Sequence, residues 1–469
     1  MIAHLICDGV ERSVRDIDDR QCQPKGNPMA EHLVDAAIRL MDGGRDVAYF
    51  FINDQFVVWD WVDDRCRNGV HALDELAAPP GFVPPQAIAP AVPTAVIDAA
   101  LTGKHGYAGF HYLFSGGHYV RFRTAPARVF DPVAISDLAS WRLPFARVDA
   151  SYNGALNRDD FCYFFRGSQY VRYSWSRDLP DGPSKQIANM VAMPPTFATG
   201  VDAGVDGGAG YEDCSYLFKE TSYVRFQWVN GAVEPHAEAP SPILGNWVGL
   251  AELLAVAKAK SIAVTWLAAA QRQLAAYVST LTLGTPFPFD QAVIDLALDR
   301  HFHILPGQPP AAKAVLVGQI LGVYALISGT LAASATKIWF RTEEEANVQD
   351  VGSAVHAAYV WPLAPSPDAR INITRHFLDR SELNRVSSLI HEAMHVNDPA
   401  SATSDNHISE WYVTAPMAAT LGLAFQPDAP ATFATRYDLM DTAHALHNPS
   451  AYATFARHVS FGVDNRELP

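Results

Sequence analysis

The sequence predicts a multidomain protein in which an all-β, four-bladed β-propeller precedes a mainly helical α+β domain. Three observations support this prediction. The chain has 469 residues, too many for one ordinary hydrophobic core. Its first half contains four similar segments of aromatic strands, and its second half changes to long runs rich in Ala and Leu. The expected divisions are an N-terminal segment at 1–29, the propeller at 30–240 and the second domain at 241–469.

The four repeats each contain an aromatic strand, a short polar turn and a second aromatic strand, which is the pattern of a β-hairpin. The hairpin segments begin at Tyr49, Tyr112, Tyr163 and Tyr216. An Asp-Ala pair lies 14 residues before each of these tyrosines, at Asp35, Asp98, Asp149 and Asp202. This constant spacing indicates four copies of one unit of about fifty to sixty residues, the size of a propeller blade.

These units resemble hemopexin-like repeats over residues 30–240. In that family the Asp-Ala segments line a central channel that often holds calcium, sodium or chloride. The resemblance implies that the four aspartates face such a channel and that Ca²⁺ or Na⁺ binds there. It also implies a protein, glycan or haem-like ligand, although packing between blades explains most single aromatic residues. The family often joins its first and last blades by a disulfide, and Cys66 and Cys214 are not clearly positioned for one.

Composition narrows the class of protein. The chain is 49% hydrophobic and 18% charged, which is typical of a globular protein. Its net charge of -15 disfavours binding to nucleic acid or to anionic membranes. The five cysteines include no CxxC pair and predict no disulfide framework. The N-terminal residues show no signal peptide, so we expect a cytoplasmic protein or one exported by a non-classical route as a secreted effector.

The second half begins after residues 235–246, a Pro- and Ala-rich segment that predicts a linker. Helices are predicted at 247–281, 289–302 and 311–335, and short strands at 357–362 and 369–374. Residues 314–336 carry no charged side chain and are long enough to span a bilayer. Because glycine and polar residues dilute this stretch, we expect a buried helix of a soluble domain and no membrane span.

A His-Glu-x-x-His motif, from His391 through Glu392 to His395, carries the chemistry of the second half. On a helix, residues four apart share a face, so both imidazoles can bind one ion, and zinc is the expected metal. Glu392 is then placed to deprotonate a metal-bound water. A third protein ligand is needed. Asp398 and Ser401 stand where a metzincin needs Gly and His, which excludes that class, whereas Glu410 keeps a gluzincin as an alternative.

The tetrad ending at Asp405, Ala-Thr-Ser-Asp, resembles the Gly-Thr-x-Asp motif of aspzincins, the family of deuterolysin and lysine-specific metalloendopeptidases. Segments 357–362, 370–377 and 448–456 follow the family's order, so the resemblance covers about residues 250–460. It implies zinc bound by His391, His395 and Asp405, with Glu392 as general base. The family's oxyanion tyrosine is replaced by Ile408, and Tyr412 is the candidate substitute. Other candidate ligands are His407, Asp428, Asp438 and Asp441.

Together these features predict a zinc metalloendopeptidase of zincin type, with a hemopexin-like domain that binds a target or protein substrate. By analogy, such a combination fits a toxin or effector. Residues 369–374, if they form a sheet edge, are expected to align a peptide by strand addition. The alternative, from a different class, is a hemopexin-like binding protein whose metal domain is catalytically inert.

Overall fold

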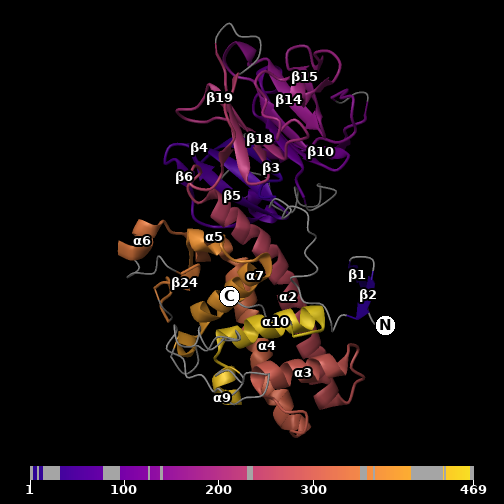
Figure 1. Ribbon diagram of the computed structural model, residues 1–469, viewed down its shortest axis with the longest axis vertical. Helices are drawn as coiled ribbons and strands as arrows, with labels where there is room; N and C mark the ends of the chain where they lie inside the picture. The colour runs from indigo at the N-terminus through magenta and orange to yellow at the C-terminus, as the bar shows by residue number, and fades with distance from the viewer. Residues whose placement is uncertain are drawn as a thin grey trace.

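The computed structural model places four β-sheets at one end of the molecule and a helical body at the other (Figure 1). It describes residues 32–77, 96–124, 127–137, 141–229, 236–348, 356–362, 365–402, 437 and 440–464, together with the backbone of 4–7 and 10–13. The two N-terminal segments form an antiparallel pair, β1 (His4–Cys7) and β2 (Val10–Ser13).

The first half contains four antiparallel sheets of five strands each, and the predicted aromatic hairpin forms the centre of every sheet. The first sheet comprises β3 (Ala36–Asp42), β4 (Arg45–Ile52), β5 (Gln55–Asp60), β6 (Arg65–Cys66) and β7 (His71–Ala72). The second comprises β8 (Ala99–Thr102), β9 (Phe110–Ser115), β10 (His118–Thr124), β11 (Ala127–Val129) and β12 (Val133–Ala134). The third comprises β13 (Ala150–Asn153), β14 (Phe161–Arg166), β15 (Gln169–Ser174), β16 (Leu179–Pro180) and β17 (Lys185–Gln186). The fourth comprises β18 (Ala203–Asp206), β19 (Cys214–Lys219), β20 (Ser222–Gln227), β21 (His236–Ala237) and β22 (Ser241–Pro242).

The first strands of the four sheets contact one another in a closed cycle, in the order β3, β8, β13, β18 and back to β3. A hydrophobic cluster fills each of the four spaces between neighbouring sheets. In β4, for example, Phe50 packs towards the fourth sheet, whereas Tyr49 and Phe51 pack towards the second. Because both faces of the central strands are buried, their sequences are nearly continuous in aromatic and aliphatic residues.

The segment predicted as a linker, residues 235–246, instead completes the fourth sheet. Both β21 and β22 pair with β20, and Ile243 after them is buried. Strands of two residues carry no alternating pattern, and β22 contains a proline, so the sequence does not reveal them. The sheet body therefore extends past residue 240 and runs directly into the first long helix.

The second half is helical with a small sheet, as predicted, and its three long helices lie close to the expected ranges. The helices are α2 (Leu250–Leu283), α3 (Gln291–Phe302), α4 (Pro310–Ala332), α5 (Ser334–Lys337), α6 (Glu343–Val348), α7 (Glu382–Asn397), α9 (Thr442–Ala445) and α10 (Pro449–Phe461). The sheet has the order β23 (Ile338–Phe340), β25 (Ile371–Ile373), β24 (Ala358–Val360).

The prediction that residues 369–374 form a sheet edge is wrong. β25 is the central strand, parallel to β23 and antiparallel to β24. Strand β23 was not predicted, because a three-residue strand directly after a helix gives no periodic signal. Among the described strands of this sheet, β24 is the edge that contacts helix α7.

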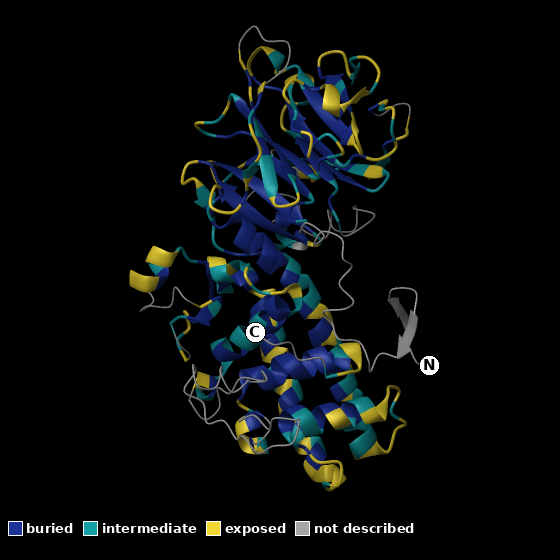
Figure 2. Cartoon of the chain, viewed as in Figure 1, coloured by how far each residue is buried: buried dark blue, intermediate teal, exposed yellow. Residues whose placement is uncertain are grey.

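A continuous buried core joins the two halves, as the unbroken dark blue region between the sheets and α2 in Figure 2 shows. Trp247 packs against the rings of Phe50 in the first sheet and Phe218 in the fourth. Lys260 of α2 is buried and donates hydrogen bonds to Gln55 Oε1 at 2.7 Å and to Ser334 Oγ at 2.5 Å. Sheets and helices are therefore packed as one body at this junction.

Two helices, α2 and α4, are long and apolar enough to cross a membrane by length and composition. Core helices of soluble proteins meet the same criterion, and both helices are compatible with a soluble protein. The predicted helix at 314–336 is confirmed as α4, which packs on α2 and α7. Its burial is partial, since Val315 and Leu326 are exposed.

Candidate metal centre

Helix α7 holds the His-Glu-x-x-His motif inside the helical body. Ser381 caps its N-terminus by accepting a hydrogen bond from the Asn384 N–H, in the manner of a typical N-cap. Apolar residues three and four apart form one buried face, and the helix packs against α2, α4, α10, β24 and β25. The buried apolar residues are Val386, Leu389, Ile390, Ala393 and Met394. This packing fixes the direction in which the two histidines project.

The two imidazoles converge, as the helical spacing predicts. The Nε2 atoms of His391 and His395 lie 3.2 Å apart. Tetrahedral zinc with Zn–N bonds of about 2.0–2.1 Å places two ligand nitrogens about 3.3 Å apart. His395 is buried and His391 is half-buried. The pair therefore has the spacing of two ligands on one zinc ion.

Glu392 follows His391 in the sequence and is half-buried. Burial raises its pKa to about 8, and the positive charge of Arg380 lowers it in part. Positive charge at the two imidazoles would favour the carboxylate form further, since an opposite charge stabilises the ionised state. A carboxyl group with a pKa raised in this way can exchange a proton close to neutral pH.

Two serine hydroxyls contact the outer nitrogens of the imidazoles. Ser401 Oγ lies 2.7 Å from Nδ1 of His395, and Ser450 Oγ lies 3.2 Å from Nδ1 of His391. Ser401 comes from the short helical turn Pro399–Ala402 after α7, and Ser450 from the first turn of α10. Sequence reasoning missed both residues, because serines at these positions match no ligand spacing.

The proposed third ligand and the oxyanion tyrosine fall outside the described residues. This applies to Asp405, His407, Glu410, Tyr412, Asp428 and Asp438. Asp441 is described and caps α9, where its carboxylate accepts the His444 N–H at 2.9 Å. Within the described ranges, no His, Cys, Asp or Glu completes a set of three with His391 and His395. Their role as a zinc pair thus depends on a ligand from elsewhere in the chain.

A second cluster brings His301, His458 and Asp464 together, with one ligand atom of each within 4.8 Å of the others. Its histidines already bind protein groups: His301 Nε2 lies 2.9 Å from His458 Nδ1, and its Nδ1 lies 2.9 Å from the Tyr437 hydroxyl. Asp464 accepts a hydrogen bond from Arg300. A buried hydrogen-bonded network accounts for this arrangement without an ion.

The four Asp-Ala aspartates perform the same structural role in each sheet. Each carboxylate accepts the backbone N–H of the residue 18 positions later, at distances of 2.6–2.8 Å. The four recipients adopt positive φ angles between the paired strands, so the aspartate stabilises a left-handed turn. The pairs are Asp35–Asn53, Asp98–Gly116, Asp149–Gly167 and Asp202–Glu220. Binding of Ca²⁺ or Na⁺ by these carboxylates stays a prediction.

Asp35 and Asp202 share a further partner that links the first and fourth sheets. His32 Nε2 lies 2.5 Å from Asp35 Oδ1, and His32 Nδ1 lies 3.2 Å from Asp202 Oδ2. Hydrogen bonds to Asp202 and Asp35 raise the pKa of His32 to about 10. Among the cysteines whose side chains are described, Cys66, Cys162 and Cys214 are free and buried, so none of the three joins these sheets by a disulfide.

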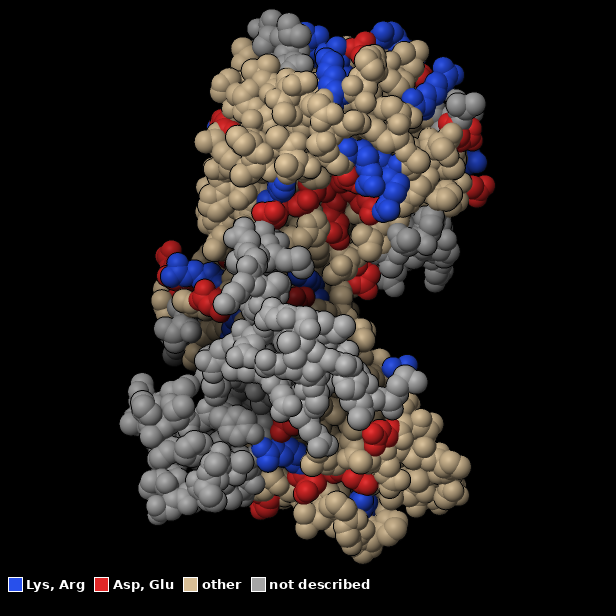
Figure 3. Space-filling model, turned by 45° about the vertical axis from the view of Figure 1, so that its right-hand side comes forward, with Lys and Arg blue, Asp and Glu red and all other residues tan. Residues whose placement is uncertain are grey.

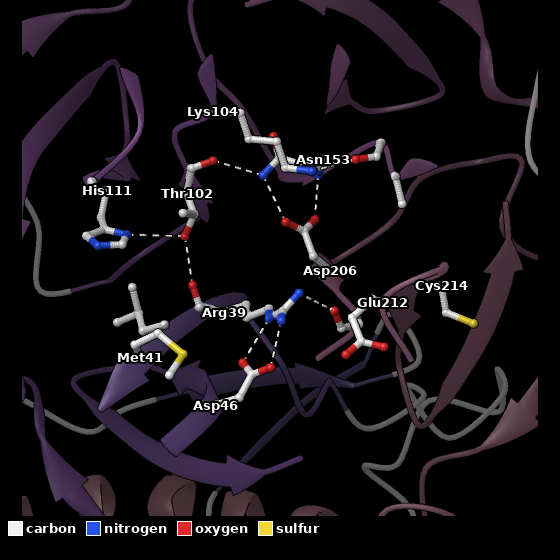
Figure 4. A pocket seen from close by; sticks show the side chains of 15 residues that line it. Arg39, Met41, Asp46, Thr102, Lys104, His111, Asn153, Asp206, Glu212 and Cys214 are labelled. Atoms are coloured by element: carbon white, nitrogen blue, oxygen red, sulfur yellow. Dashed lines mark hydrogen bonds and ion pairs between the residues drawn. The ribbon is translucent and has the colours of Figure 1, made fainter. Parts of the chain in front are cut away.

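A cavity of about 360 Å³ lies where the first strands of the sheets end (Figure 4). Four of its lining residues occupy the same repeat position, four residues after each Asp-Ala aspartate: Arg39, Thr102, Asn153 and Asp206. Arg39 pairs with Asp46 at 2.6 Å, and Asn153 Nδ2 donates to Asp206 Oδ2 at 2.8 Å. Aligning the four repeats on their Asp-Ala aspartates would have identified these four lining residues from the sequence.

Charged side chains are distributed in small groups on the surface that Figure 3 shows. In the view of Figure 3, Lys and Arg side chains form small groups beside Asp and Glu, and the coloured part of that face shows no continuous basic field.

Comparison with known proteins finds similar solved structures for about half of the chain. No family model matches the chain, and no curated protein matches it. Among solved structures, the N-terminal half is similar to a hemopexin-fold protein and to a plant lectin. One is a hemopexin-fold protein of cow pea, at 21% identity and a TM-score of 0.38, covering 46% of this chain and 96% of that one. Another is a plant lectin with two metal-binding sites from Cicer arietinum, at 20% identity and a TM-score of 0.37, covering 46% and 95%.

Proposed function

We propose that this protein is a zinc-dependent endopeptidase of aspzincin type, carried behind a four-bladed hemopexin-like propeller. The observation that carries the proposal is the 3.2 Å separation of the His391 and His395 Nε2 atoms on a helix fixed in the core. Glu392 beside them supplies the general base. The closed cycle of β3, β8, β13 and β18 supports the assignment of the four sheets as propeller blades.

His391 and His395 would hold the zinc, with a carboxylate such as Asp405 as the third ligand. When bound, zinc lowers the pKa of a coordinated water and polarises a substrate carbonyl. Glu392 accepts the proton of the attacking water and returns it to the leaving amine. Tyr412 stays the candidate for stabilising the oxyanion.

Strand β24 is the surface that supports peptide alignment. On its β25 side, Trp361 N donates to Arg370 O and Thr374 N donates to Ala357 O, both at 3.1 Å. Because backbone groups alternate in an antiparallel pair, those of Ala358 and Val360 face away from β25. An extended substrate would add to this edge as a further strand.

Zinc content and casein digestion test the proposal together. Purified protein should contain about one zinc per chain and should digest unfolded casein. Glu392→Gln should keep its zinc and lose about a hundredfold or more in rate, as removal of a general base does. His391→Ala should lose both zinc and activity. A Glu392→Gln protein that digests casein as fast as the parent would refute the mechanism.

The cavity at the ends of the first strands supports a second candidate function. In this alternative the protein is a hemopexin-like binding protein, and its metal domain is catalytically inert. The lining of the cavity carries Arg39, Lys104, Asp206 and Glu212, so it offers a few charged groups that can orient a small ligand. Under this alternative, the parent protein and all its variants leave casein intact, whether or not the parent contains zinc. The casein experiment therefore separates the two functions.

A further inference from the structure

We infer that Ser401 is a positioning residue that fixes His395 in the tautomer able to bind a metal ion, and that Ser450 holds the ring of His391 from a second helix. This inference rests on the proposed function. It assigns to two serine hydroxyls the task that carboxylates or backbone carbonyls perform around many metal-binding histidines.

The proton positions around Ser401 follow from its neighbours. Ser401 Oγ donates to the backbone carbonyl of Asp398 at 2.6 Å. A carbonyl oxygen can only accept, and a hydroxyl has a single proton, so Ser401 Oγ must act as the acceptor towards His395. The Nδ1 atom of His395, 2.7 Å away, is therefore the donor. In the neutral ring Nε2 then carries the lone pair, and Nε2 is the atom that faces His391.

Local structure holds Ser401 in place for this contact. Asp398 ends α7, and its Oδ1 accepts the Ala400 N–H at 2.9 Å, which closes the turn that carries Ser401. The Oδ2 atom of Asp398 lies 2.7 Å from Nδ1 of His447, which directly precedes the N-cap of α10. Ser401 is fully buried, so water does not compete for its hydroxyl.

Ser450 acts on the other imidazole through the packing of α10 on α7. Its backbone N–H binds the N-cap residue Asn448 at 3.1 Å, which fixes the first turn of α10. Its Oγ lies 3.2 Å from His391 Nδ1, a longer contact than that of Ser401. We therefore expect a smaller effect from Ser450 than from Ser401.

The first measurement reads the tautomer directly in the metal-free protein. Nitrogen-15 NMR of the histidine rings distinguishes a protonated Nδ1 from a protonated Nε2. For neutral His395 we expect the Nδ1–H tautomer, and in Ser401→Ala we expect a mixture or the Nε2–H tautomer. A His395 that is Nε2–H in the parent, or unchanged in Ser401→Ala, would overturn the inference.

The second measurement is zinc affinity by competition with a chelator. Ser401→Ala should bind zinc about 10 to 100-fold more weakly, and Ser401→Thr, which keeps the hydroxyl, should recover most of the loss. Ser215→Ala is the matched control, because Ser215 Oγ is also fully buried, donates to the Asn153 carbonyl and accepts the Trp228 ring N–H. It should leave zinc affinity unchanged.

The outcomes separate this inference from the proposed function. If the parent binds zinc and Ser401→Ala binds it equally well, the positioning role is refuted and the peptidase proposal stands. If the parent binds no zinc but shows the Nδ1–H tautomer lost in Ser401→Ala, the hydroxyl positions His395 and the peptidase proposal fails.

Discussion

Replacing His32 with glutamine tests how the first and fourth sheets are held together. The imidazole contacts Asp35 of the first sheet and Asp202 of the fourth at 2.5 and 3.2 Å. Glutamine keeps a polar side chain of similar reach and removes the positive charge. Since the cycle of sheets closes between β3 and β18, we expect the substitution to weaken that closure.

The magnitude follows from the pKa of His32, which its two carboxylate partners raise from 6.5 to about 10. Each pKa unit corresponds to about 1.4 kcal/mol, so a shift of this size implies roughly 5 kcal/mol if solvent did not intervene. The His32 side chain is 44% exposed, however, and solvent screens both pairs. We therefore expect a loss of about 1–2 kcal/mol.

The pH dependence has a definite sign. A folded-state pKa above the ordinary value stabilises the protein fully below pH 6.5, and this stabilisation disappears as the pH rises through about 10. Urea denaturation of the parent and of His32→Gln, followed at several pH values, measures the difference directly. A difference as large above pH 10 as at pH 6, or no difference at pH 6, would refute the reasoning. His236→Gln, at an exposed histidine of β21, is the control.

Two other perturbations follow from the structure. Lys260→Ala should lower the free energy of unfolding by about 1–3 kcal/mol in urea, because it leaves the buried Gln55 oxygen without this donor at the junction of sheets and helices; a change below about 0.5 kcal/mol would contradict this role. Zinc at about a hundredfold excess over its dissociation constant should stabilise the parent by about 2.7 kcal/mol in thermal unfolding. It should have no such effect on His391→Ala, and equal stabilisation of both proteins would count against the site.

The sequence correctly predicted those features that depend on local pattern. The constant spacing from Asp35 to Tyr49, repeated four times, predicted four sheets with hairpins at their centres. Runs rich in Ala and Leu predicted α2, α3 and α4. The spacing of His391 and His395 predicted two converging imidazoles, since four residues make about one helical turn.

Other features depend on contacts between distant residues, which no local pattern encodes. β25 became a central strand because β23, more than thirty residues earlier, pairs with its free side. The residues predicted as a linker form strands because they pair with the edge of β20. The aspartates of the repeats also accept hydrogen bonds from the turns of their own hairpins, 18 residues later, and their position at a channel stays a prediction.

The amino-acid order by itself determined the repeats, the helices and the pair of histidines, because each follows from the periodicity of one strand or helix. Tertiary structure alone decided what surrounds them. The packing of α10 on α7 brings Ser450 to His391 across 59 residues of sequence. The meeting of the first and last sheets brings Asp202 to His32. Such contacts arise when whole elements pack to bury their apolar faces, so their partners are selected by the fold and not by neighbours in the chain.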